Sequence, residues 1–107
     1  IIQLEVGGAF HSPLMQVAEQ ELRTVIEGTK FKCPICPIYQ NVSASPSLDP
    51  DEIKQNLVAQ LVRPVRWTQT IRNMIFDGAN SFTEIGPGKV LQALIKKIDN
   101  TVKIQSV

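Results

Sequence analysis

Stretches with the apolar spacing of an α-helix alternate with short, strand-like runs along nearly the whole chain. This alternation is typical of α/β folds, in which right-handed crossovers place helices on both faces of a parallel sheet. We therefore predict a partial three-layer α/β architecture. The helices are expected at residues 13–27, 50–61, 67–78 and 90–98, and the strands at residues 1–6, 38–42, 81–85 and 101–107.

Each expected helix carries one apolar face, which a sheet or a neighbouring helix would bury. Ser12 and Pro13 mark the first helix start, Asp49 and Glu52 form a capping-box-like start of the second, and Gly28 stands where a left-handed residue is common. The residues predicted to be buried are Leu14, Ala18, Leu22, Val25 and Ile26, then Ile53, Leu57, Val58 and Leu61, then Ile71, Met74 and Ile75, and finally Val90, Leu91, Leu94, Ile95 and Ile98.

The composition is that of an ordinary globular domain, with 107 residues, 43% hydrophobic, 20% charged and a formal net charge of +1. Balanced charge gives no strong field for nucleic acid or for an anionic membrane. No apolar run approaches the roughly 20 residues that a membrane helix needs. We expect a protein of the cytoplasm, or of an organelle lumen, with no nucleic-acid or membrane partner.

The chain begins at Ile1, inside a strand-like run, rather than with a methionine. A sheet of the predicted strands would also have edges without neighbours. We therefore interpret residues 1–107 as part of a larger domain, whose missing part lies N-terminal to this chain.

The only histidine, His11, lies at the junction between the first strand-like run and the first helix. Histidine can accept and return a proton near neutral pH, and such junctions form the mouth of α/β sites. The alternative is a packed or solvent-exposed ring beside Phe10. Spacing alone does not decide between these two interpretations.

Three motifs occur in the same order as in a known family. They are GAFHSPLM (residues 8–15), VAQLVRPVRW (58–67) and EIGPGKVL (84–91). With these motifs the chain resembles the malonyl-CoA:acyl carrier protein transacylases and the acyltransferase domains of fatty acid and polyketide synthases. The resemblance covers nearly the whole chain, but only about the last third of a complete transacylase.

The resemblance implies a role for each motif. His11 would be the general base for a catalytic serine, and the backbone carbonyl of Gln60 would orient its ring. Phe10, Ile85 and Gly86 would line the acyl pocket, with the Phe10 form of the motif associated with malonyl selectivity. For Gln60, a solvent-facing helix position is the competing interpretation.

The nucleophile of the family is absent from this chain. In that family the serine sits in a G-H-S-x-G elbow, and none of the serines here has the flanking glycines. Ser12 is expected to cap the first helix rather than to act as a nucleophile. We therefore predict that the chain alone is inactive.

Other polar features have ordinary structural interpretations. The Gly86 to Gly88 turn is not a P-loop, because the spacing and the terminal Lys-Ser/Thr are absent. Arg63 and Arg66 could meet CoA phosphates or an acidic carrier protein, although such arginines more often form a solvated face. The family's carboxylate-binding arginine lies upstream of this chain, so that role is assigned to neither residue.

Cys33 and Cys36 form a C-x-x-C, which could be half a zinc site or a redox dithiol. No second pair of cysteines or histidines completes four zinc ligands, and no helix start follows to lower a thiol pKa. We expect two reduced cysteines used in packing, and neither a metal nor a cofactor.

Taken together, these features predict the C-terminal part of the α/β-hydrolase-like subdomain of an acyltransferase. The parent would move malonyl from CoA to acyl carrier protein through a serine ester, so malonyl-CoA, acyl carrier protein and the missing N-terminal part of the domain are the expected partners. The alternatives are an acyltransferase for a different acyl group and a non-catalytic α/β interaction module.

Overall fold

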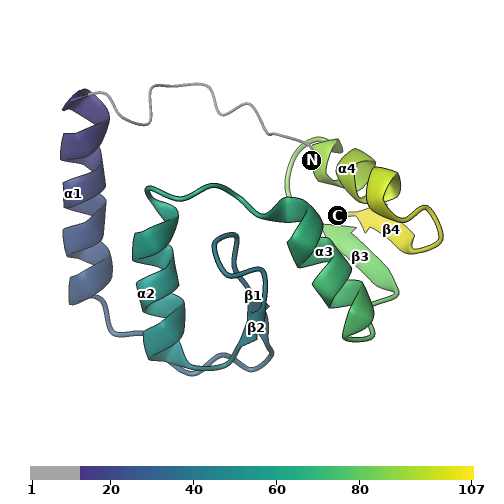
Figure 1. Cartoon of the computed structure of the whole chain (residues 1–107), viewed down its shortest axis with the longest axis horizontal. Helices are drawn as coiled ribbons and strands as arrows, with labels where there is room; N and C mark the ends of the chain where they lie inside the picture. The colour runs from purple at the N-terminus through teal and green to yellow at the C-terminus, as the bar shows by residue number, and fades with distance from the viewer. Residues whose placement is uncertain (1–12) are drawn as a thin grey trace.

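The computed structural model describes residues 13–107, with side chains from residue 16 onward. This part of the chain is α/β, as predicted. Its elements are α1 (Pro13–Gly28), β1 (Ile38–Tyr39), β2 (Pro46–Ser47), α2 (Pro50–Gln60), α3 (Trp67–Phe76), β3 (Ser81–Glu84), α4 (Val90–Ile98) and β4 (Lys103–Ser106). Figure 1 shows α1, α2 and the β1–β2 pair on one side, and α3, α4 and the β3–β4 pair on the other. The predicted strand at 1–6 lies outside the described residues.

The described strands form two separate pairs. β3 and β4 are parallel, with Ser81 opposite Lys103 and Glu84 opposite Ser106, and α4 packs against both strands. This βαβ unit agrees with the predicted parallel sheet. Helices on both faces of a larger sheet are not seen in this part of the chain.

β1 pairs antiparallel with β2, so the expectation that residues 38–42 join a parallel sheet is wrong in this structure. The reason is a tight turn inside the predicted Ser/Pro loop. Ala44 adopts a positive φ of 55°, and its N–H donates to the Gln40 carbonyl at 2.9 Å. The chain is thereby reversed, and β2 returns alongside β1.

The helix boundaries follow the sequence signals closely, because caps and prolines act locally. The Asp49 carboxylate accepts from the Asp51 N–H at 3.0 Å, and Pro50 opens α2. In a full capping box the Glu52 side chain would accept from the Asp49 N–H. Here Ser47 Oγ accepts from that N–H instead, at 3.2 Å. The predicted left-handed Gly28 is wrong. Gly28 is the last residue of α1 and does not have a positive φ.

The core is small, and its buried apolar residues come from α2, the β1–β2 turn, α3 and α4. Ile71 is only 2% exposed, and Gln40 joins the hairpin to α2 by donating from Nε2 to the Ile53 carbonyl at 2.8 Å. The buried apolar residues in the described part are Ala44, Ile53, Ile71, Leu94 and Ile95. Burial is therefore confirmed for four predicted core positions, Ile53, Ile71, Leu94 and Ile95. The other predicted positions in α2 and α3, and Ile98 in α4, are half-buried.

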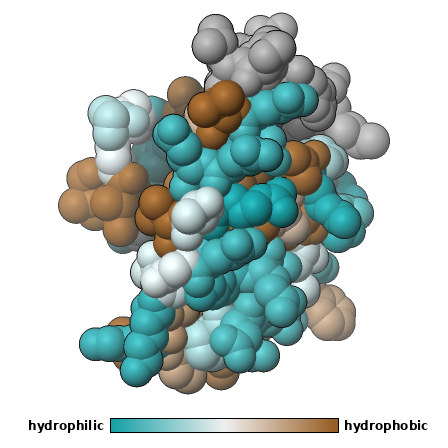
Figure 2. Space-filling model, turned by 90° about the vertical axis from the view of Figure 1, so that its left-hand side faces the viewer, coloured by the Kyte–Doolittle hydropathy of each residue, from teal (hydrophilic) through white to brown (hydrophobic). Residues whose placement is uncertain are grey.

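The predicted burial of the α1 stripe is wrong in this structure, although α1 itself forms. Leu22 is 46% exposed and Val25 is 64% exposed, whereas Ile26 is half-buried. Their exposure follows from the position of α1 at the edge of the molecule, where α2 is its principal neighbour (Figure 1). Figure 2, viewed from the α1 side, shows hydrophobic side chains flanking a polar band. Val90 and Leu91 are likewise exposed at the start of α4.

Candidate functional site

The residues that the sequence predicts for the site fall in three places. His11 and Phe10 lie outside the described residues and precede α1 directly in the chain. Gln60 is the half-buried last residue of α2, and Ile85 and Gly86 follow β3. Within the described part, no hydrogen bond joins the end of α2 to the turn after β3. The described residues therefore do not join these two places directly.

The Gln60 carbonyl oxygen is an open acceptor. A helical carbonyl accepts from the N–H four residues later, and here that residue is Pro64, which has no N–H. The two residues after Gln60 donate instead to earlier carbonyls of α2, both at 3.2 Å. No donor from the described residues reaches the Gln60 oxygen, so it is available to a group outside them.

Trp67, the last residue of the second motif, opens α3. Its indole Nε1 is buried and has no hydrogen-bond partner among the residues that the structure describes. A buried donor of this kind normally has an acceptor. The surroundings of α3 are therefore incomplete in this part of the chain.

The turn after β3 requires glycine at two positions. Gly86 has a φ of +128° and Gly88 a φ of +85°, conformations that residues with a side chain rarely adopt. A Cβ at either position would meet nothing within 4 Å, so the requirement is conformational and not one of space. Ile85, between β3 and this turn, is 84% exposed. In the described part, the predicted pocket wall thus faces open surroundings.

Glu84 closes this turn onto α4, a role that the sequence analysis missed. Its carboxylate accepts from the Leu91 N–H at 3.3 Å and from the Gln92 side-chain amide at 3.2 Å. The N-terminus of a helix favours a negative charge and leaves N–H groups without partners. An ordinary N-cap residue lies immediately before its helix, whereas Glu84 belongs to β3 and reaches the start of α4 across the glycine turn.

Arg66 serves the scaffold. Its N–H donates to the Asn41 carbonyl at 3.0 Å, its Nη1 donates to the Ser43 carbonyl at 3.4 Å, and its Nε donates to Gln69 Oε1. The contacts with Asn41 and Ser43 join the start of α3 to the β1–β2 turn, and the contact with Gln69 stays within the first turn of α3. Arg63 is exposed, which agrees with the solvated-face interpretation.

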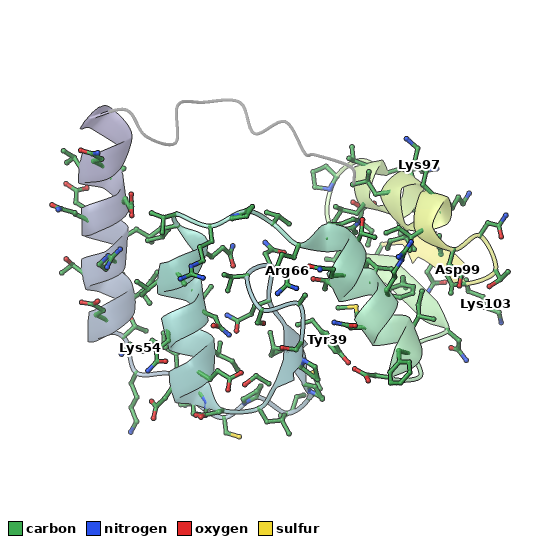
Figure 3. The ribbon with its side chains drawn as sticks, viewed as in Figure 1. Tyr39, Lys54, Arg66, Lys97, Asp99 and Lys103 are labelled. Atoms are coloured by element: carbon green, nitrogen blue, oxygen red, sulfur yellow. The ribbon has the colours of Figure 1, made fainter. Side chains whose placement is uncertain are left out.

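A second connection between the hairpin and α3 was also missed. Asn73 Nδ2 donates to the Ala44 carbonyl at 2.7 Å, and the Tyr39 hydroxyl donates to the Asp77 carboxylate. The Asp77 hydrogen bond, followed by desolvation and the Asp77 charge, raises the pKa of Tyr39 above its ordinary value of 10.0. Figure 3 labels Tyr39 and Arg66 between the hairpin and α3. No local sequence signal predicts these pairings, because each joins segments far apart in the chain.

Cys33 and Cys36 are free and exposed, so the expectation that they pack in the interior is wrong. Cys33 Sγ lies 3.4 Å from the Leu48 carbonyl, within reach of a weak hydrogen bond. Among the described residues, no group of three or more His, Cys, Asp or Glu side chains is placed to hold a metal ion. None of the helices described here is long and apolar enough to span a membrane.

Comparison with known proteins gives a consistent result along the whole chain, although no protein-family model matches it. The chain is 42% identical over 106 residues to the malonyl CoA-acyl carrier protein transacylase of Bacillus subtilis, which is 99% of this chain and 33% of that protein. The corresponding protein of Staphylococcus aureus is 41% identical over 107 residues, 100% of this chain and 35% of its own length.

Solved structures agree with the sequence comparison. The acyl carrier protein S-malonyltransferase of Vibrio cholerae matches with a TM-score of 0.81 at 38% identity, over 97% of this chain and 34% of that one. The malonyl-CoA:ACP transacylase of Synechocystis matches with a TM-score of 0.86 at 34% identity, over 97% of this chain and 36% of that one. The chain thus spans about a third of the length of its relatives. In sequence and in fold, it is homologous to that third of a malonyl CoA-acyl carrier protein transacylase.

Proposed function

We propose that the chain is the C-terminal part of the large α/β subdomain of an acyltransferase that moves malonyl from CoA to the phosphopantetheine thiol of acyl carrier protein. The end-to-end similarity to malonyl CoA-acyl carrier protein transacylases carries this proposal. A further similar structure is described as a type II PKS acyl-carrier protein in complex with its malonyl-transacylase. That complex supports acyl carrier protein as the partner. The cytoplasmic location expected from the sequence stays a prediction.

In the proposed reaction, His11 moves the protons. The serine hydroxyl, supplied by the part of the domain outside this chain, loses its proton to His11 and attacks the thioester carbonyl of malonyl-CoA. His11 then gives that proton to the departing CoA thiolate, which leaves a malonyl-serine ester. In the second half, His11 takes the proton of the carrier thiol, the thiolate attacks the ester, and the proton returns to the serine oxygen.

Gln60 is proposed to orient His11. A neutral imidazole has one N–H donor and one acceptor nitrogen, so a base must be held in the tautomer that points its acceptor at the nucleophile. The open Gln60 carbonyl can accept from the other ring nitrogen. It also stabilises the imidazolium that forms during transfer. The missing helical partner at Pro64 supports this assignment.

Phe10, Ile85 and Gly86 are proposed to form one wall of the acyl pocket. The exposure of Ile85 supports this, because a large apolar side chain that is 84% exposed needs a covering group. The glycine turn that follows Ile85 would place the backbone of Gly86 beside the same covering group. Phe10 would exclude a methyl branch on the α-carbon of the substrate.

The rest of the domain is proposed to complete the three-layer architecture. It would extend the β3–β4 pair into a larger parallel sheet with helices on both faces, cover the apolar face of α1 and supply an acceptor to the buried Trp67 Nε1. The exposure of Leu22 and Val25 supports such a cover.

A hybrid enzyme tests the proposal. The matched 106 residues of the Bacillus subtilis transacylase are replaced by this chain, and malonyl transfer to acyl carrier protein is measured. We expect the hybrid to be active and His11→Ala to lower the rate by about 10²–10⁴, with malonyl-CoA binding largely kept. Ser12→Ala is the matched control and should stay active. A His11→Ala hybrid within about threefold of the parent rate would favour the non-catalytic module instead.

A further inference from the structure

The two cysteines lie in the connection between α1 and β1, residues 29–37, which is anchored at both ends. At its start, Lys54 Nζ donates to the Thr29 carbonyl at 3.0 Å, and to the Glu27 carbonyl in the last turn of α1 at 2.7 Å. At its far end, Ile38 begins β1, which pairs with β2. The ends of the connection are therefore held by α2 and by the β1–β2 pair.

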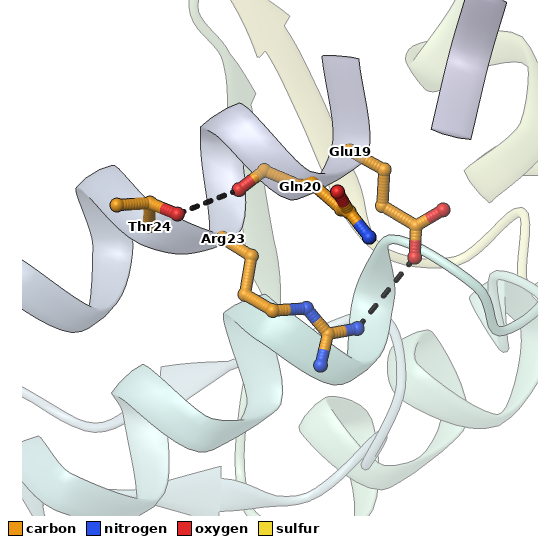
Figure 4. A network of polar contacts seen from close by, with 4 residues as sticks. All are labelled: Glu19, Gln20, Arg23 and Thr24. Carbon is orange, nitrogen blue, oxygen red and sulfur yellow. Dashed lines mark hydrogen bonds and ion pairs between the residues drawn. The ribbon is translucent and has the colours of Figure 1, made fainter. Parts of the chain in front are cut away.

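The middle of the connection, in contrast to α1, has little hydrogen bonding of its own. Within α1, Glu19 pairs with Arg23 at 3.6 Å. Thr24 Oγ1 also donates to the Gln20 carbonyl at 2.9 Å (Figure 4). In the part of the chain that the structure describes, residues 30–37 make no hydrogen bond between backbone groups. Two of them are prolines, which have no N–H to donate. This segment can therefore adjust without breaking regular structure.

The course of the segment favours an approach of the two cysteines. Three steps of extended chain would separate the Cα atoms of Cys33 and Cys36 by roughly 10 Å, whereas a disulfide needs about 4.4–6.8 Å. The chain bends at residues 35 and 36, which shortens this separation. Ile35, at the bend, is fully exposed, and so are both thiols to solvent. A small reagent can therefore reach either sulfur.

We propose that Cys33 and Cys36 form a reversible disulfide by exchange with a small disulfide such as oxidised glutathione. One cysteine thiolate attacks a sulfur of the small disulfide, a mixed disulfide forms, and one small thiolate leaves. The other cysteine thiolate attacks the protein sulfur of the mixed disulfide, and the second small thiolate leaves. The cysteines lose two electrons and two protons, which end on the two small thiols. Neither cysteine takes part in the proposed acyl transfer.

Oxidation would also remove a contact between the connection and the start of α2. In the reduced chain, Cys33 Sγ lies 3.4 Å from the Leu48 carbonyl and donates to it. A disulfide sulfur has no hydrogen to donate, so this hydrogen bond is lost on oxidation. Leu48 comes immediately before Asp49, the N-cap residue of α2. The pair is thus a redox-sensitive modification site whose state changes the contacts of a helix start.

The test measures exchange in the chain of residues 1–107, whose two cysteines share the tryptic peptide 33–54. In a buffer of reduced and oxidised glutathione, we expect this peptide to lose the mass of two hydrogen atoms and to carry no glutathione. Cys33→Ser and Cys36→Ser are matched controls, and each should stop at a mixed disulfide with one glutathione. A parent chain that stays reduced, or that retains glutathione, would overturn the proposal.

Comparison with the unfolded chain measures what the fold contributes. If the anchored connection brings the sulfurs together, the equilibrium constant for forming the disulfide should be larger in the folded chain than in urea. For so short a loop we expect a ratio of about tenfold or more. A ratio of one or less would show that the fold holds the cysteines apart, and the proposal would be wrong. If the chain does not fold alone, the hybrid enzyme yields the same peptide. This measurement does not depend on malonyl transfer, so its failure would leave the proposed function intact.

Discussion

The exposed apolar face of α1 gives a prediction in which one substitution has different consequences in two settings. Leu22 and Val25 belong to the stripe that the sequence predicts to be buried, yet they are 46% and 64% exposed. If the rest of a transacylase domain covers this face, their replacement by serine should destabilise the hybrid enzyme more than the isolated chain.

The magnitude follows from the exposed fractions. Full burial of a Val or Leu side chain stabilises a protein by about 1.5–3 kcal/mol, so covering the exposed half of each contributes about 1 kcal/mol. A polar replacement at a covered position adds the cost of a cavity and of a buried hydroxyl. The double variant Leu22→Ser/Val25→Ser should lower the unfolding free energy of the hybrid by about 2–4 kcal/mol. The isolated chain already covers the rest of each side chain, so the change there should be smaller, about 1–2 kcal/mol.

Urea unfolding followed by circular dichroism measures both values, with Glu21→Ser on the same helix as a polar control. The control should leave both proteins within about 0.5 kcal/mol of their parents. Equal destabilisation in the two settings would mean that the stripe is already packed in the chain alone. No destabilisation in the hybrid would mean that nothing covers α1, and the proposed place of this chain in the domain would be wrong.

Four further predictions test separate parts of the reasoning. In the hybrid, Phe10→Ser should shift the malonyl to methylmalonyl ratio of kcat/KM toward methylmalonyl by roughly 1–3 kcal/mol, the size of a one-methylene effect, and an unchanged ratio in competition would remove Phe10 from the pocket. The isolated chain should acquire no protein-bound label from radiolabelled malonyl-CoA, because on the proposed mechanism it contributes the base and the rest of the domain contributes the nucleophile, and stoichiometric label would contradict this. Ile71→Ala, at a position 2% exposed, should destabilise the chain by about 2–5 kcal/mol, whereas Ile35→Ala, at a fully exposed position, should change little in the same urea titration. Hydrogen bonds from Thr101 lower the pKa of Asp99 below its ordinary 3.8, so the turn after α4 should be stabilised above that pH and loosen as the pH falls through the lower native pKa, as read from the Thr101 amide signal.

The boundaries of the elements could be predicted because their determinants are local. Asp49 and Pro50 start α2, and the βαβ order of the last third of the chain gives the parallel pairing of β3 with β4. The antiparallel β1–β2 pair could not be predicted, because it depends on Ala44 adopting a positive φ. Alanine carries no propensity for that conformation. The long-range contacts of the Glu84 carboxylate and of Lys54 also leave no periodic signal, since each depends on the tertiary placement of a neighbouring element.

The remaining disagreement, on α1, concerns what covers the helix and not whether it forms. An apolar stripe at helical spacing indicates that the helix is packed against other elements in the whole protein. The exposure of Leu22 and Val25, in contrast, depends only on the contacts that residues 13–107 provide. The predicted burial and the observed burial agree best at Ile26, which is half-buried on a helix whose principal neighbour is α2. They differ at the more exposed positions of the stripe. The uncovered helix is also the one that directly follows His11 in the chain. If His11 is the base, as proposed, a partner that covers α1 would complete the core next to the segment that carries it, so we expect folding of the whole domain and assembly of its site to be coupled.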